Sequence, residues 1–136
     1  MRKEEEVEGA GRIVLVGTEL MSESRIAEGA RALGYEVQAA GTIEAVITAL
    51  ALAPADVLIL DLQAEGVPWR EAVEVARRAG DSGLAVLAYG RHIKPELAAA
   101  ARDAGCDLVV ARSEVMGDLR GVIERALGAA SHRLKS

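Results

Sequence analysis

The stretch that decides the fold is Asp56-Val57-Leu58-Ile59-Leu60-Asp61. Four consecutive apolar residues between two aspartates are typical of a parallel strand that is buried on both faces of its sheet. We interpret this stretch as the central strand of an α/β domain. Asp61 then stands where the strand leaves the sheet, and ligands in open α/β folds bind at the carboxyl ends of the strands. Asp61 is therefore the first candidate for a functional residue.

Strands and helices are predicted to alternate along the rest of the chain. The predicted strands are residues 12–17, 35–40, 56–61, 84–88 and 107–111, and the predicted helices are residues 19–33, 42–52, 69–79, 95–104 and 114–130. This alternation, with right-handed crossovers, gives a parallel sheet that is covered by helices on both faces. The predicted fold class is therefore α/β, with a flavodoxin-like (βα)5 doubly wound parallel sheet of five strands in the order 2-1-3-4-5.

The length of 136 residues suits a single domain. We expect a flexible acidic N-terminal tail at residues 1–10, the α/β domain at residues 11–130 and a C-terminal tail at residues 131–136. Because only that short tail follows the last predicted helix, we expect the domain to stand alone, without an attached output domain.

The composition excludes several classes of function. Phe is absent, and the chain has one Trp and two Tyr, so it lacks the aromatic surfaces on which single-stranded nucleic acid stacks. The net charge of −5 also disfavours general attraction to phosphate backbones. One cysteine, Cys106, allows no disulfide within the chain, and no apolar run has the length of a membrane span or the position of a signal peptide. We expect a cytoplasmic protein with no nucleic acid or membrane as a direct partner.

Four motifs follow one another in an order that is informative about the family. They are Ile13-Val14-Leu15-Val16 with Glu19 after it, Leu33-Gly34-Tyr35-Glu36-Val37, the run from Pro54 to Leu62, and Ala104-Gly105-Cys106-Asp107. Together they resemble the receiver domain of two-component response regulators, over roughly residues 12–127. The resemblance implies that Asp61 occupies the phospho-acceptor position.

The accessory positions around the acceptor depart from the receiver pattern. A carboxylate that attacks a phosphoryl group needs a divalent cation, which receivers hold with an acidic pair after the first strand. The matching residues Gly17 and Thr18 carry no carboxylate, so Glu19 and Asp61 are the only candidate metal residues. The remaining switch and phosphate-site positions of the family match Ala88 in place of a hydroxyl residue, with Tyr89 after it, Val109 in place of an aromatic, and Arg112 in place of a lysine.

We therefore predict a pseudo-receiver, in which the fold is kept and Mg²⁺-dependent phosphorylation is lost. Such a protein acts in signal transduction by docking onto another signalling protein, with no enzymatic activity and no cofactor. Asp61 is then vestigial and forms an ion pair with Arg112 across the end of the sheet. The resemblance also implies a homodimer through the helix at residues 95–104, the strand at 107–111 and the helix at 114–130.

Two alternatives stay open. The first is a genuine receiver that is phosphorylated on Asp61, with Mg²⁺ bound at Asp61 and Glu19. The second is a sensor of a small anionic ligand, because Arg91, His92 and Lys94 follow the fourth predicted strand beside Arg112 and a helix N-terminus.

Overall fold

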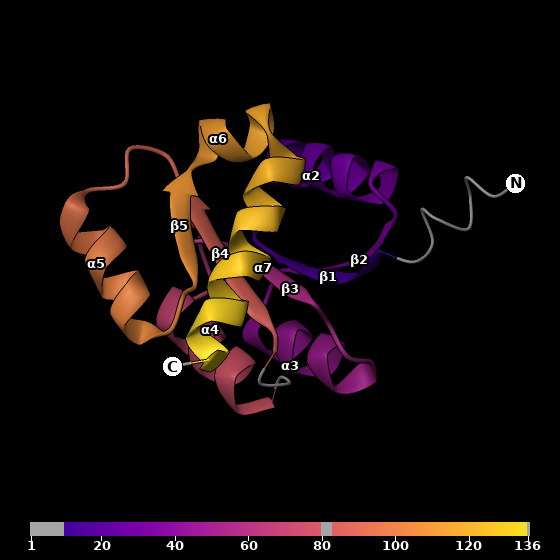
Figure 1. The fold of residues 1–136 in the computed structure, drawn as a ribbon, viewed down its shortest axis with the longest axis horizontal. Coiled ribbons are helices and arrows are strands. Elements are labelled where there is room, and N and C mark those ends of the chain that lie inside the picture. Colours follow the sequence, from indigo (N-terminus) through magenta and orange to yellow (C-terminus); the bar gives the residue numbers. More distant parts are fainter. Residues whose placement is uncertain (1–9, 80–82, 136) are drawn as a thin grey trace, which may run out of the picture.

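The computed structural model describes residues 10–79 and 83–135. Its strands are β1 (Gly11–Val16), β2 (Tyr35–Ala40), β3 (Val57–Asp61), β4 (Ala85–Gly90) and β5 (Leu108–Ala111). They form one parallel sheet in the order β2-β1-β3-β4-β5 (Figure 1). The α/β fold class, the doubly wound sheet and the strand order predicted from the sequence are confirmed.

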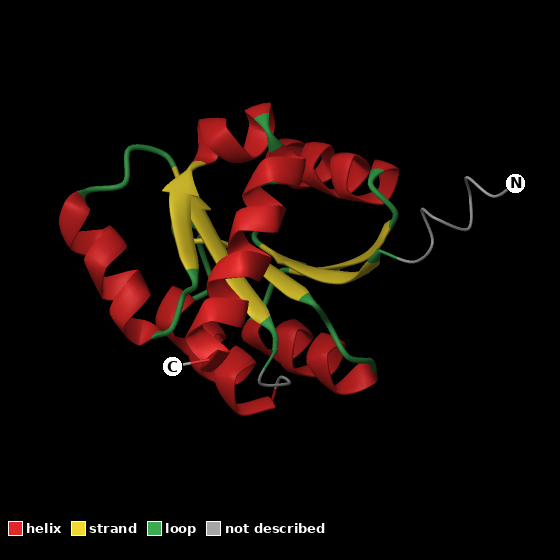
Figure 2. Cartoon of the chain, in the orientation of Figure 1, coloured by secondary structure: helices red, strands yellow, loops and turns green. Residues whose placement is uncertain are grey.

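Helices cover both faces of this sheet (Figure 2). The described helices are α2 (Leu20–Ala32), α3 (Ile43–Leu52), α4 (Trp69–Ala79), α5 (Pro95–Ala104), α6 (Arg112–Gly117) and α7 (Leu119–Lys135). Side chains alternate along β3, so Leu58 and Leu60 pack against α3, α4 and α5, while Val57 and Ile59 pack against α2, α6 and α7. All four are fully buried, as expected for the central strand of a parallel sheet.

The C-terminal part of the chain differs from the prediction of one helix at residues 114–130. Asp118 leaves the helical region of backbone conformation, with φ −150° and ψ 64°, and separates α6 from α7. Its Oδ1 accepts a hydrogen bond from the Gly121 N–H at 3.1 Å, so the side chain caps the new helix and competes with a continuous one. Helix α7 continues to Lys135, and residues 131–135 are therefore helical rather than a tail. Of the predicted N-terminal tail, residues 1–9 lie outside the described residues.

A buried ionic network holds the amino end of the sheet. The Asp107 side chain is 2% exposed and pairs at 2.7 Å with both Arg77 of α4 and Arg133 of α7. Asp107 also accepts a hydrogen bond from the Val86 N–H at 2.9 Å. Burial alone would raise the pKa of Asp107, but the hydrogen bonds from Arg133, Val86 and Arg77 outweigh it and lower that pKa. The network ties two helices on opposite faces to the start of β5, just before Leu108.

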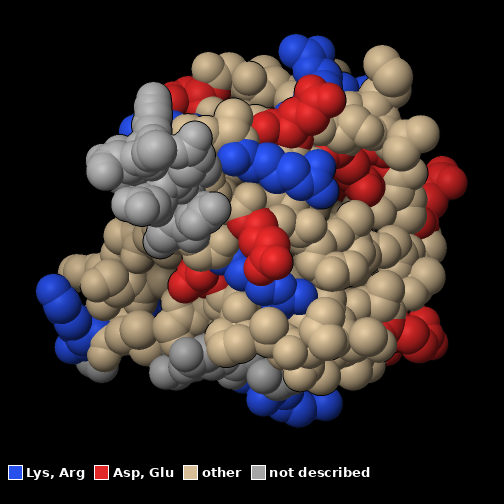
Figure 3. Space-filling view, turned by 90° about the vertical axis from the view of Figure 1, so that its right-hand side faces the viewer, with Lys and Arg blue, Asp and Glu red and all other residues tan. Residues whose placement is uncertain are grey.

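None of the helices in the described ranges combines the length and the apolar character needed to cross a membrane. Figure 3 shows one face of the molecule, on which acidic and basic side chains are interspersed rather than gathered into a patch of one sign.

Candidate functional site

Asp61 is the last residue of β3 and opens into a pocket of about 360 Å³ at the carboxyl end of the sheet. We call this the Asp61 pocket; it is lined by Thr18, Glu19, Asp61, Gln63, Ala64, Glu65, Gly90, Arg91 and Arg112. Asp61 is only 9% exposed, and its Oδ1 accepts a hydrogen bond from the Gln63 N–H at 2.9 Å. Burial raises the pKa of Asp61, the Gln63 hydrogen bond opposes the rise, and the negative charge of Glu19 adds to it.

Glu19 forms ion pairs with both arginines of the pocket. Its carboxylate lies 3.3 Å from Arg91 and 3.7 Å from Arg112, and it accepts a hydrogen bond from the Ser22 hydroxyl at 2.8 Å. The Ser22 hydrogen bond, with smaller contributions from Arg112 and Arg91, lowers the pKa of Glu19. The predicted ion pair between Asp61 and Arg112 is therefore wrong, because Arg112 forms its ion pair with Glu19 instead.

A carboxylate that the sequence reasoning missed lies against the end of β1. A Cβ atom placed on Gly17 would fall 2.5 Å from Glu23 Oε2 and 3.4 Å from Asp61 Cβ. Glu23 belongs to α2, one helical turn after Glu19, and it fills the space that a side chain at position 17 would occupy. The Glu23 carboxylate fits there because Gly17 has no side chain. The expectation that Glu19 alone supplies a second acid near Asp61 is corrected.

Two buried polar atoms near Asp61, Glu23 Oε2 and the Tyr89 hydroxyl, have no hydrogen-bond partner within the part of the chain that the structure describes. Tyr89 is 1% exposed and lies beside Asp61 in the register of β3 and β4. Burial and the charges of Asp61 and Glu23 raise the pKa of Tyr89, so the hydroxyl is neutral. Burial also raises the pKa of Glu23; a hydrogen bond from the Glu19 backbone opposes this rise, and the charge of Asp61 adds to it.

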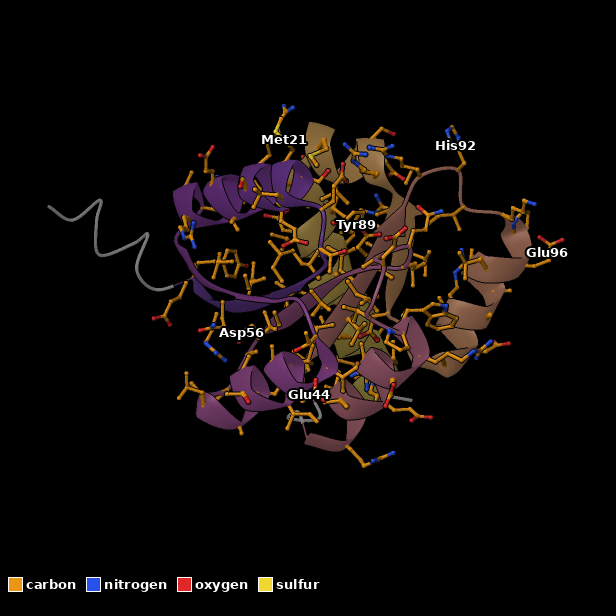
Figure 4. The ribbon with its side chains drawn as sticks, turned by 180° about the vertical axis from the view of Figure 1, so that it is seen from behind. Met21, Glu44, Asp56, Tyr89, His92 and Glu96 are labelled. Carbon is orange, nitrogen blue, oxygen red and sulfur yellow. The ribbon has the colours of Figure 1, made fainter. Side chains whose placement is uncertain are left out.

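Strand β4 is longer than predicted, and this changes the assignment of the hydroxyl position. The strand ends at Gly90 rather than at Ala88. Ala88 is fully buried in the core beneath α3, α4 and α5, whereas Gly90 lines the Asp61 pocket. Ala88 is therefore wrong as the pocket position and Gly90 replaces it. Tyr89, which falls just after the predicted strand, is instead a residue of β4 and is buried in the core on the α2 side of the sheet (Figure 4).

Gln63 connects Asp61 to the loop that follows β4. Its side-chain Nε2 donates to the Arg91 carbonyl at 2.8 Å, and its Oε1 accepts from the Arg91 N–H at 2.7 Å. The next residue, His92, has a positive φ of 48°, a conformation that costs free energy for a residue with a Cβ. The two hydrogen bonds of Gln63 thus hold the loop at the rim of the Asp61 pocket.

The four residues predicted as an anion site do not line one common pocket. Arg91 and Arg112 line the Asp61 pocket and also a larger open groove of about 710 Å³ beside the edge strand β5. His92 lines only this β5 groove, and its side chain lies at the outer surface (Figure 4). Lys94 is exposed and lines neither space. Val109, predicted at the switch position, lines the β5 groove as well.

The resemblance implies a divalent cation beside Asp61, and the described residues offer such an ion few ligands. Within residues 10–79 and 83–135, no group of three or more His, Cys, Asp or Glu side chains is placed to hold a metal. Mg²⁺ in proteins is commonly bound by one or two carboxylates and keeps several waters. Asp61 is the residue that would hold such an ion, whereas Glu23 is not among the residues that line the Asp61 pocket. Glu19, predicted as a metal residue, is instead paired with the arginines.

Comparison with solved structures places this fold among receiver domains. The receiver domain of a sensor histidine kinase from Pseudomonas aeruginosa, solved with a magnesium ion in its active-site cleft, has a TM-score of 0.73 and 18% identity, covering 87% of this chain and 98% of that one. The N-terminal domain of a response regulator/sensory box/GGDEF protein from Carboxydothermus hydrogenoformans has a TM-score of 0.74 and 21% identity, covering 90% of this chain and 98% of that one.

NtrX from Brucella abortus gives a TM-score of 0.80 at 20% identity over 93% of this chain, which spans 28% of the length of NtrX. No protein-family model matches the sequence, and no match is found among curated proteins. At these identities the likeness shows the fold alone. The chain has the fold of response-regulator receiver domains, as its motifs predicted.

Proposed function

We propose that this protein is a cytoplasmic pseudo-receiver, which acts in signal transduction by docking onto another signalling protein and is not phosphorylated by the Mg²⁺-dependent route. The observation that carries the proposal is the pairing of Glu19 with Arg91 and Arg112. A positive charge that would stabilise a phosphoryl group on Asp61 is already neutralised by an internal carboxylate. Gly90 adds to this, because the pocket lacks a hydroxyl donor there. We expect no enzymatic activity of its own.

Incubation with acetyl phosphate and Mg²⁺ tests this proposal directly. We expect the intact mass of the parent protein to stay unchanged, as in the Asp61→Asn variant. A phosphoryl adduct on the parent that is absent from Asp61→Asn would contradict the proposal. It would establish the second candidate, a phosphorylatable receiver, which is favoured by the position of Asp61 at the end of β3 inside a pocket.

We propose the β5 groove as the docking surface. It combines apolar residues, such as Ala98 and Met116, with the charged residues Arg112 and Glu114. Ala98→Arg would fill the groove from α5, and Ala99→Arg places the same charge on an exposed part of that helix outside the groove. Once a partner has been isolated, we expect only Ala98→Arg to weaken its binding. Equal binding by both variants would exclude this groove.

The homodimer through α5, β5 and α7 remains part of the proposal. Arg102 and Asp103 are exposed on α5, where they could face a second copy. The molar mass from light scattering during gel filtration tests it: a dimer that Asp103→Arg dissociates is expected, and a monomer at high protein concentration would contradict it.

A further inference from the structure

Helix α3 has an outer surface that is almost free of charge. Residues 37–55 contain one charged residue, Glu44, although 27% of the whole chain is charged. Each of the other helices in the described ranges carries at least two charged residues. A helix that meets only water on its outer side normally presents charged and polar residues there. The outer surface of α3 therefore differs from that of the other helices.

Four uncharged residues form this surface, which we call the α3 face. They are Ile47, Thr48, Ala51 and Leu52, and all four are exposed. At 3.6 residues per turn they lie within about 140° of the helix circumference, so they make one continuous surface. The exposed fraction is 70% for Leu52 and 47% for Ile47. Two large aliphatic side chains are thus open to solvent at the periphery of the molecule, where α3 lies beside α4 (Figure 1).

The order of side-chain sizes on the α3 face is the same in both directions along the helix. The large residues Ile47 and Leu52 stand at its two ends, and the small residues Thr48 and Ala51 lie between them. A two-fold axis through the middle of this face would pair Ile47 of one copy with Leu52 of the other. The small residues would meet at the centre, where they let two helices approach closely. Such self-complementarity is what the interface of a symmetric dimer requires.

The distribution of charge also favours a second copy of this chain on the α3 face. The net charge of −5 makes two copies repel each other, unless the surfaces in contact are nearly neutral. The two-fold axis makes the helices antiparallel and places the two Glu44 residues about 16 Å apart along them, which exceeds the screening length of about 8 Å at physiological ionic strength. A partner selected by its charge would find no ion pair on this face.

We propose that the α3 face is the contact of a symmetric dimer of this chain, in which two α3 helices pack antiparallel. This contact is separate from the one proposed through α5, β5 and α7, because α3 packs on β1 and β2, and β2 and β5 are opposite edges of the sheet. Stable interfaces bury more surface than four side chains from each copy provide, so this dimer is weak and forms at concentrations above those of gel filtration. None of the described residues of α3 lines the Asp61 pocket or the β5 groove, so the dimer leaves both open.

Sedimentation equilibrium of the full chain over a range of concentrations tests this proposal. All the proteins carry Asp103→Arg, so that the contact through α5, β5 and α7 does not contribute. We expect Asp103→Arg alone to dimerise as its concentration rises, and added Ile47→Glu to weaken the dimer at least about tenfold, because it places a charge in an apolar contact. Met21→Glu is the matched control: Met21 is 74% exposed on α2, and this variant should dimerise as Asp103→Arg alone does.

A pair of opposite charges tests which residues meet. Leu52→Lys should also weaken the dimer, whereas Ile47→Glu and Leu52→Lys in the same chain place opposite charges against each other and should restore dimerisation. Both positions are exposed, so the variants should fold, which far-ultraviolet circular dichroism checks. A protein that stays monomeric up to about 1 mM, or an equal dissociation constant for Ile47→Glu and Met21→Glu, would overturn the inference. Failure of the double variant to dimerise would overturn the antiparallel pairing.

Discussion

At the scale of single residues, Glu19 decides what the Asp61 pocket can bind. Its carboxylate occupies the two guanidinium groups that would otherwise attract an anion into the pocket. Arg91 and Arg112 present planar forks that suit a carboxylate or a phosphate equally well. An internal carboxylate and an external anion therefore compete for the same two residues.

Glu19→Gln should accordingly create an anion site. Without the carboxylate, Arg91 and Arg112 line the pocket unpaired, and inorganic phosphate should raise the melting temperature of this variant but not that of the parent. Glu65→Gln, which removes another acid that lines the same pocket, is the control and should behave as the parent. Phosphate stabilisation of the parent equal to that of Glu19→Gln would show that Glu19 does not block the site.

Gly17 provides a second test at this scale. Gly17→Ala places a Cβ against Glu23 Oε2, so we expect it to lower the free energy of unfolding by about 1–3 kcal/mol. In a Glu23→Ala background the same substitution should cost clearly less, which a double-mutant cycle in urea measures. Equal costs in the two backgrounds would mean that Glu23 does not lie at the end of β1.

Asp61 and Glu23 differ in how well the sequence alone predicts their place in the site. Asp61 could be predicted because a buried strand places its last residue at a fixed edge of the sheet. Glu23 could not, because reading the chain position by position shows only that Gly17 lacks a carboxylate. That a helix returns one to the same space depends on the distance between α2 and β1. The only signal in the sequence is the i, i+4 spacing of Glu19 and Glu23, which places them on one side of a helix.

At the scale of elements, the Asp107 network fixes α4 and α7 to the sheet. The network joins two helices on opposite faces through one carboxylate, which is 2% exposed. Removing the carboxylate from a buried ion pair with two arginines lowers the stability of the fold strongly, because the arginine charges are then left without a partner.

Asp107→Asn should therefore lower the free energy of unfolding by about 2–4 kcal/mol at neutral pH, measured by urea denaturation. The matched control is Glu74→Gln on α4, which removes an exposed ion pair with Arg78 at 3.7 Å. Exposed pairs contribute little, so that variant should stay within about 1 kcal/mol of the parent. A loss for Asp107→Asn as small as that of the control would contradict the structural role of the network.

The same network predicts a pH dependence. The pKa of Asp107 is lower in the folded state than in the unfolded state. Around pH 4, Asp107 therefore binds fewer protons in the folded protein than in the unfolded chain. Its contribution is complete above the unfolded pKa and is lost as the pH falls through the folded pKa. The difference in stability between the parent and Asp107→Asn should shrink in acid, and a difference that is constant from pH 7 to pH 3 would contradict the assignment.

Two errors of the sequence prediction also belong to the scale of elements. β4 extends two residues beyond the predicted end at Ala88, because Tyr89 and Gly90 still pair with β3 or β5. The last helix is broken at Asp118, whose side chain caps α7. In both places the boundary depends on local hydrogen bonding, which the apolar pattern does not reveal. The error at the end of β4 led to Ala88 being assigned to the pocket position that Gly90 occupies.

At the scale of the whole molecule, the fold was predictable because the pattern of apolar residues that produces it is periodic along the sequence. Buried runs such as residues 57–60 alternate with amphipathic helices, and the handedness of the crossovers leaves few topologies. The state of the site was not predictable in the same way, since it depends on which of two acids pairs with Arg112. This choice separates a pocket that is ready for a phosphoryl group from one that is already neutralised.

The most direct measurement of that difference is the melting temperature in Mg²⁺ alone and in Mg²⁺ with beryllofluoride, which mimics a phosphoryl group on an aspartate. The pseudo-receiver account predicts that the melting temperature in Mg²⁺ with beryllofluoride equals that in Mg²⁺ alone. Additional stabilisation by beryllofluoride that disappears in Asp61→Asn would contradict it, and would show that Asp61 still accepts a phosphoryl group despite the pairing of Glu19 with Arg112.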